Sequence, residues 1–227
     1  VKWSERAYVT YLNKLRSDVF DTVVGGWDDA ARSPDRLSQL ASFLNHATGR
    51  GDLDAFRGML PVLNATFFSP RLLASRFQLP ADLVTKPLVR GLVARDLAIT
   101  LGTGLTILGM VKASGVGDVQ LDPRSTDFGK IKVGKQHIDF WGGFQPIARY
   151  AAQLATLTRK TAAGDIVPVT PGDTLLRFLR SKMSPPVGAL YDVTLGGRKS
   201  FTGEPFEFTG KAVGSQILQS VMPLFLQ

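Results

Sequence analysis

The chain has 227 residues, of which 44% are hydrophobic, so it is long and apolar enough to form one large domain or two small ones. It contains no cysteine, which excludes disulfide scaffolds, thiolate zinc sites and cysteine nucleophiles. Its 27 Lys and Arg against 19 Asp and Glu give a net charge of +8, which favours polyanionic partners such as nucleic acid or an anionic membrane surface. A solvated basic surface is the alternative explanation.

The first third of the sequence predicts helices separated by glycine and proline. Apolar residues recur every three or four positions over 4–24, with Ser4 as a candidate N-cap and Gly25 and Gly26 at the end. A serine followed by proline, at Ser33-Pro34, is typical of a helix start, and this second helix is expected to run to about residue 46.

Proline residues shape the next predicted helices. A third helix begins near residue 52 and is kinked or divided by Pro61. Ser69-Pro70 is another start signal, for a short helix that carries residues 71–77. Residues 79–82 include Pro80 and are expected to be a break.

An apolar stretch from Leu97 to Val111 is the most informative part of the sequence. Its 15 residues carry no charge, whereas Arg95 and Asp96 precede it and Lys112 follows it. A helix needs roughly 20 apolar residues to cross a bilayer, so three alternatives stay open: a buried core helix, a membrane-active segment, or a hinge or oligomer contact. Small residues in a helix let another backbone approach closely. The candidate residues for helix packing or membrane contact are Ala98, Gly102, Gly104, Ile107 and Gly109.

The middle of the chain predicts a small β-hairpin near residues 130–140. Polar and apolar residues alternate over 130–133 and over 136–140, with a glycine-containing pair between the two runs. A lone hairpin is only marginally stable, so we expect it to rest on helices.

Helices are predicted again in the last part of the chain, from about 144 to 160, from Thr170-Pro171 onward, from Pro185-Pro186 to about 195, and from 211 to 222, with a loop at 196–205. The predicted fold class is therefore mainly α, an irregular helical bundle with one small β-hairpin near residues 130–140. We expect an N-terminal helical part over 1–118 and a second part, with the hairpin and the C-terminal helices, over 119–227. The missing initiator Met and the apolar end at 221–227 suggest a fragment of a larger chain.

No motif for catalysis is visible. Gly102-Thr103-Gly104 matches neither GxGxxG nor the P-loop, and no GxSxG occurs. His46 and His137 are far apart and outside any HExxH pattern, so no metal ligand set is visible. Asp28-Asp29 is expected to cap the following helix. We therefore expect no catalytic residue, metal or cofactor, and no enzymatic activity.

Two basic clusters are candidates for contact with the phosphates of DNA or lipid. One lies on the predicted hairpin and the other on the helix after residue 171. For the hairpin lysines, protection of a strand edge from further pairing is the alternative, and we favour it there. The residues concerned are Lys130, Lys132, Lys135, Arg177, Arg180 and Lys182.

Five strings in the sequence together carry a resemblance: Phe67–Arg71, Leu121–Ile131, Ile138–Gln145, Arg177–Pro185 and Phe201–Pro205. Over roughly residues 5–227 the chain resembles an uncharacterised region near the C-terminus of very large tailed-bacteriophage proteins, of the polyvalent or internal virion (ejection) type. Such proteins are often packaged with the genome and ejected into the host, where some cross or line the envelope.

The resemblance implies a structural segment of an internal virion protein. It would pack near the portal or tail, assist genome delivery, and associate with itself, with other virion proteins and with DNA. Its expected location is the virion and, after ejection, the host cell envelope. The alternatives are a membrane-inserting module that acts after ejection and a non-catalytic scaffold domain of a multi-enzyme phage polyprotein.

Overall fold

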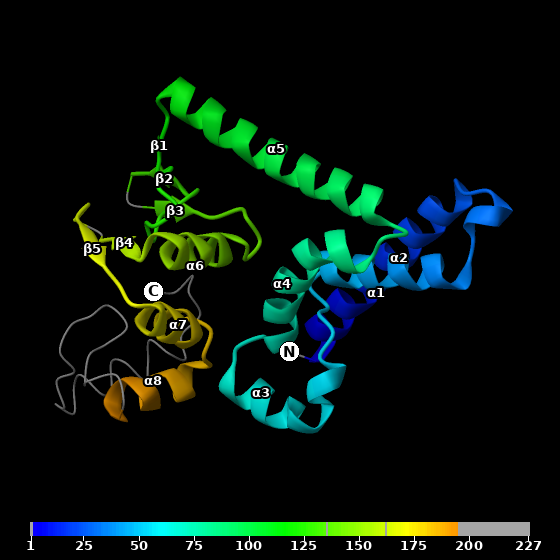
Figure 1. The fold of residues 1–227 in the computed structure, drawn as a ribbon, viewed down its shortest axis with the longest axis horizontal. Coiled ribbons are helices and arrows are strands. Elements are labelled where there is room, and N and C mark those ends of the chain that lie inside the picture. Colours follow the sequence, from blue (N-terminus) through cyan, green and yellow to red (C-terminus); the bar gives the residue numbers. More distant parts are fainter. Residues whose placement is uncertain (1, 135, 162, 195–227) are drawn as a thin grey trace. The chain divides into compact units, whose positions relative to one another are not determined.

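The computed structural model describes residues 2–134, 136–161 and 163–194 (Figure 1). The chain divides into two compact units, one made of Val1–Ala55 with Pro70–Pro171 and the other of Phe56–Ser69 with Gly172–Gln227. The expected boundary at residue 118 does not coincide with this division, because the segment before it and the hairpin after it pack together in the first unit. The predicted loop at 196–205 and helix at 211–222 lie outside the described residues.

The predicted mainly α fold is confirmed. The described helices are α1 (Lys2–Gly25), α2 (Pro34–Ala47), α3 (Leu60–Thr66), α4 (Pro70–Thr85), α5 (Arg90–Ser114), α6 (Gln145–Thr156), α7 (Pro171–Arg180) and α8 (Pro185–Thr194), with 3-10 turns at Asp29–Ala31 and Asp54–Met59. The strands are β1 (Asp118–Val119), β2 (Ile131–Val133), β3 (Gln136–Ile138), β4 (Thr158–Lys160) and β5 (Ile166–Pro168).

Several predicted helix starts are confirmed by their caps. The Ser33 side chain accepts a hydrogen bond from the backbone N–H of Arg36, and Pro34 occupies the first turn of α2. Asp28 accepts from the N–H of Ala31 and so caps the 3-10 turn that follows it. Ser4 as an N-cap was wrong, because α1 already begins at Lys2.

Two prolines behave differently, Pro61 in the second unit and Pro80 in the first. The helix expected from residue 52 is divided as predicted, into a 3-10 turn and α3, and Pro61 lies in the first turn of α3. The predicted break at residues 79–82 was wrong, because α4 continues through Pro80. The proline deprives the carbonyl of Arg76 of its usual donor. Burial of Leu79 and Asp82 on either side offsets that loss and keeps the segment helical.

The predicted hairpin is confirmed as β2 and β3, which pair antiparallel with Ile131 opposite Ile138. β1 adds a third strand beside β2, with Val119 opposite Ile131. β4 and β5 form a second antiparallel pair that was not predicted. The helix expected over 144–160 ends at residue 156, because Leu157 adopts a left-handed backbone with φ of 50° and the chain then enters β4.

The first unit has two apolar clusters, and α5 contributes to both. One cluster joins α2, α4 and the start of α5, and its buried members are Leu40, Phe43, Leu44, Leu79, Val89 and Val93. The other joins the end of α5 to the three-stranded sheet through Leu108, Val119 and Ile131. Figure 1 shows α5 as a long helix with α4 at its first turns and the β1–β3 sheet at its last turns.

The second unit brings together segments that are far apart in the sequence. Phe67 and Met183 form an antiparallel bridge between the end of α3 and the residues after α7. The N–H of Phe68 donates to the carbonyl of Lys182 at 3.0 Å, and the N–H of Ser184 donates to the carbonyl of Thr66 at 2.7 Å. These backbone bonds fix α3 beside the connection between α7 and α8.

Candidate functional site

The helix α5 has an inner face that packs within its own unit. A Cβ at Gly104 would lie 2.5 Å from the Trp141 ring, so only glycine lets the indole approach this closely. Ile107 is half-buried and packs against the cluster formed with the β1–β3 sheet. Two of the predicted packing residues, Gly104 and Ile107, therefore contact this chain itself.

The outer face of α5 carries the other three predicted packing residues. Ala98 is exposed, and a Cβ at Gly102 or Gly109 would meet no atom within 4 Å. At 100° per residue these three positions fall on one narrow stripe, opposite the face of Gly104. Large apolar side chains flank the stripe on both sides and are mostly exposed: Ile99 (54%), Leu101 (54%), Leu105 (61%) and Met110 (59%).

This outer face is unusual for a soluble helix. Within the described part of the chain, α5 is the one helix that is long enough and apolar enough to cross a membrane, judged by length and composition alone. Of the 18 residues in its most apolar segment, 11% are buried. Isolated exposed apolar side chains are normal, but a contiguous apolar surface marks a contact site. The outer face of α5, defined by the three small residues and their four large neighbours, is therefore a candidate association surface.

The basic cluster on the hairpin is partly neutralised. Nζ of Lys130 lies 3.2 Å from Oδ1 of Asp127, and Nδ1 of His137 lies 3.1 Å from the same oxygen. Burial opposes the charge of Asp127, but the hydrogen bonds from Lys130 and His137 outweigh it and hold the pKa of that carboxyl below its usual value. Lys132 is exposed on β2, and Lys135 lies outside the described residues.

The second basic cluster is also divided. Arg180 makes a bidentate ion pair with Asp192: its Nε lies 2.8 Å from Oδ1 and its Nη2 lies 2.5 Å from Oδ2 of that carboxylate. This ion pair connects α7 to α8. Nζ of Lys182 lies 5.7 Å from the centre of the Phe178 ring. Arg177 is exposed on α7. Of the six predicted phosphate contacts, Lys130 and Arg180 thus have structural roles, whereas Lys132 and Arg177 face solvent.

The two histidines lie in different surroundings. Nδ1 of His46 lies 2.7 Å from Oδ2 of Asp82, and both side chains are buried between α2 and α4. His137 is exposed on β3 and pairs with Asp127. Among the described residues no group of three or more His, Cys, Asp or Glu could hold a metal ion.

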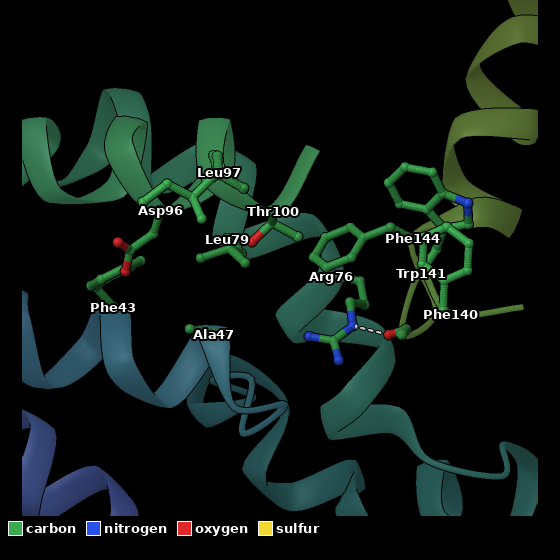
Figure 2. Close-up of a pocket in the computed structure, with 12 residues that line it drawn as sticks. Phe43, Ala47, Arg76, Leu79, Asp96, Leu97, Thr100, Phe140, Trp141 and Phe144 are labelled. Carbon is green, nitrogen blue, oxygen red and sulfur yellow. Dashed lines mark hydrogen bonds between the residues drawn. The ribbon is translucent and has the colours of Figure 1, made fainter. Parts of the chain in front are cut away.

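A pocket that the sequence did not reveal lies in the first unit. It has a volume of about 390 Å³, within the range of small-molecule sites, and its lining comes from α2, α4, α5 and the segment after the hairpin. Figure 2 shows the rings of Phe140, Trp141 and Phe144 on one side and Phe43 on the other. The remaining lining residues are Ala47, Arg76, Leu79, Asp96, Leu97, Ile99, Thr100 and Gly142.

Arg76 is the cation of this pocket. Its Nε donates to the carbonyl of Gly142 at 2.6 Å, and its guanidinium lies 4.8 Å from the centre of the Phe144 ring (Figure 2). Its Nη1 is buried and has no hydrogen-bond partner among the described residues. Burial lowers the pKa of Arg76, and no carboxylate counteracts that shift.

Trp141 is held rigidly at the wall of the pocket. Its Nε1 donates to the carbonyl of Gly129 at 2.9 Å, and its ring stacks on Phe140 with centroids 5.0 Å apart. The aromatic and glycine-rich run from Phe140 to Phe144 is the sequence signal that could have pointed to this wall. The hydrogen bond between Gly142 of this run and Arg76 could not be predicted, because the two residues are more than sixty positions apart in the sequence.

Comparison with protein-family profiles, with curated proteins and with solved structures gives no match.

Proposed function

We propose that this chain is a structural segment of a bacteriophage internal virion, or ejection, protein that associates with further copies of itself through the outer face of α5. The observation that carries the association is the exposed apolar face around Ala98, Gly102 and Gly109. The phage context comes from the resemblance of the sequence. Packing near the portal or tail and assistance in genome delivery are part of the proposal, and no catalysis is assigned to the segment.

A second copy suits this face because small residues allow two helix backbones to approach closely. Ala98 and Gly102 have the small-xxx-small spacing, and Gly109 continues the stripe two turns further on. The stripe is uncharged from Leu97 to Val111, so two copies can meet there without burying like charges. The same face on each copy forms an isologous contact, which is the commonest way for identical chains to associate.

The net charge of +8 opposes this association at low ionic strength. In a virion the negative charge of DNA would relieve the repulsion, and exposed Lys132 and Arg177 are the members of the predicted phosphate set that support such contact. Association should therefore be measured near physiological salt, where the Debye length is about 8 Å.

The test compares Gly102→Leu with Thr103→Leu by analytical ultracentrifugation over a range of concentrations. A leucine at Gly102 meets no atom of its own chain, so it should block the close approach of a second helix without disturbing the fold. Thr103 is also exposed but lies at the edge of this face, about 100° around the helix from Gly102, so a leucine there does not separate the two backbones along the stripe. We expect an oligomer that forms in a concentration-dependent way. Gly102→Leu should weaken its association at least about tenfold, which corresponds to a loss of about 1.4 kcal/mol of binding free energy, whereas Thr103→Leu should leave the association unchanged.

The absence of cysteine allows an independent check by cross-linking. Oxidation of Ala98→Cys should give a covalent dimer, whereas oxidation of Val116→Cys, which is exposed beyond the end of α5, should not. A wild-type chain that stays monomeric at about 100 μM, with no cross-linking at position 98, would contradict the proposal.

Insertion into a membrane is the second candidate, favoured by the length and composition of α5. The uncharged run of 15 residues rises about 22 Å as a helix, short of the roughly 30 Å hydrocarbon core, and the inner face is occupied by the sheet. Liposome flotation decides between the two. Leu101→Asp and Leu105→Asp should abolish flotation if α5 inserts, whereas Gly102→Leu should not, since lipid does not require a small residue there.

A further inference from the structure

Beyond association, we propose that the pocket beside Arg76 binds a small organic anion in which an aromatic ring carries an oxyanion, such as an aryl phosphate or aryl carboxylate. The binding partners would be the unpartnered Nη1 of Arg76 and the rings that line the pocket. Neither the resemblance nor the proposed association predicts a ligand at this place.

The first support is the state of Arg76. A buried donor without an acceptor is unfavourable, and more so when it is charged. Its Nε is already bonded to the carbonyl of Gly142, so the guanidinium is held in one orientation. An oxyanion has the geometry to accept from a guanidinium and would supply the acceptor that Nη1 lacks.

The second support is the aromatic character of the walls. Phe140 and Trp141 form a stacked pair whose position is fixed by the Trp141 bond to Gly129, and Phe144 lies under the guanidinium. Planar rings pack well against such walls by offset or edge-to-face contacts. The volume of about 390 Å³ is sufficient for one substituted ring.

The third support is the separation of charges in the pocket. Asp96 also lines it, and Figure 2 shows this carboxylate well apart from Arg76, with Leu79 and Thr100 drawn between them. Burial is the cause that lowers the pKa of Arg76, and Asp96 does not offset it. The Arg76 end of the pocket is therefore the end that receives the anion.

The test follows the indole N–H resonance of Trp141 by NMR during titration with phenyl phosphate. Trp27, which lies under Arg36 and is not among the residues that line the pocket, serves as an internal reference. We expect a saturable shift of Trp141 alone. Inorganic phosphate, which lacks the ring, and benzyl alcohol, which lacks the charge, should each bind at least about tenfold more weakly.

Two variants identify the site. Arg76→Gln should weaken phenyl phosphate at least about tenfold, the lower end expected for a hydrogen bond to a charged group. Ala47→Leu keeps Arg76 and narrows the pocket from the end of α2, so it should also abolish the Trp141 shift even if Arg76→Gln perturbs the fold. No Trp141 shift in the wild type, or equal responses to phenyl phosphate and benzyl alcohol, or unchanged binding by Ala47→Leu, would overturn the proposal.

Discussion

Three glycines of one helix provide a sharp test of the two faces of α5. A change from glycine to alanine inside a helix stabilises it by about 1 kcal/mol when the new methyl group has room. Gly102 and Gly109 have that room, because no atom lies within 4 Å of a Cβ built there. Both changes should raise the free energy of unfolding by up to about 1 kcal/mol.

Gly104→Ala should have the opposite outcome. Its methyl group would lie 2.5 Å from Trp141, whereas ordinary contacts begin at 3.4 Å, so the ring would have to move by the difference, 0.9 Å. The bond to Gly129 resists that movement. Overpacking of this kind costs about 1–3 kcal/mol, which cancels or exceeds the gain in helix propensity.

The assay is urea unfolding, followed by far-UV circular dichroism at a protein concentration low enough to keep the chain monomeric. Gly104→Ala should be about 1–3 kcal/mol less stable than Gly102→Ala, and its indole fluorescence should report a displaced Trp141. If the two variants unfold at the same urea concentration, Gly104 does not pack against Trp141 and the assignment of the inner face is wrong.

Three further changes test separate parts of the first unit. His46→Leu leaves the buried carboxylate of Asp82 without its partner and should lower the free energy of unfolding by about 3 kcal/mol, whereas replacing both residues by leucine should recover much of the loss in the same urea assay. Gly115 ends α5 with a left-handed backbone at φ of 68°, so Gly115→Ala should destabilise by about 1–2 kcal/mol, opposite in sign to Gly102→Ala. The hydrogen bonds from Arg124 lower the pKa of Asp122 from 3.8 to about 2. The charged carboxylate therefore stabilises the fold fully above pH 3.8, and this contribution is lost as the pH falls to about 2. Asp122→Asn should flatten the pH dependence of the free energy of unfolding in that range, and an unchanged slope would contradict the pairing.

Local signals in the sequence predicted much of the fold. Ser33-Pro34 started α2 and the alternation around Gly134 produced the hairpin, because each depends on a few neighbouring residues. Pro80 misled because its effect depends on tertiary burial of the residues beside it. The strand pair β4–β5 was missed because β4 lies at the end of the segment 144–160 that was expected to be helical.

The candidate site was predicted only in part. The apolar stretch and its small residues were visible in the sequence, but the division into two faces was not, since it depends on where Trp141 packs. Arg76 offered no signal at all, because an unpartnered guanidinium is recognised only after the surrounding rings are placed. Likewise the sequence did not reveal that Arg180, a predicted phosphate contact, pairs with Asp192.

The bridge between α3 and the segment after α7 has a consequence for the order of events on the ribosome. The hydroxyl of Ser184 donates to the carbonyl of Ala65, a residue 119 positions earlier in the chain. At about 5–20 residues per second, α3 emerges some 6–24 s before the residues that complete its unit. During that interval the intervening first unit can fold from contacts that are closer in sequence, while the end of α3 lacks the hydrogen bonds that it makes with residues 182–184. Binding of a chaperone to the nascent chain should therefore centre on residues 60–68, and a circular permutant that joins the two segments directly should shorten that exposure.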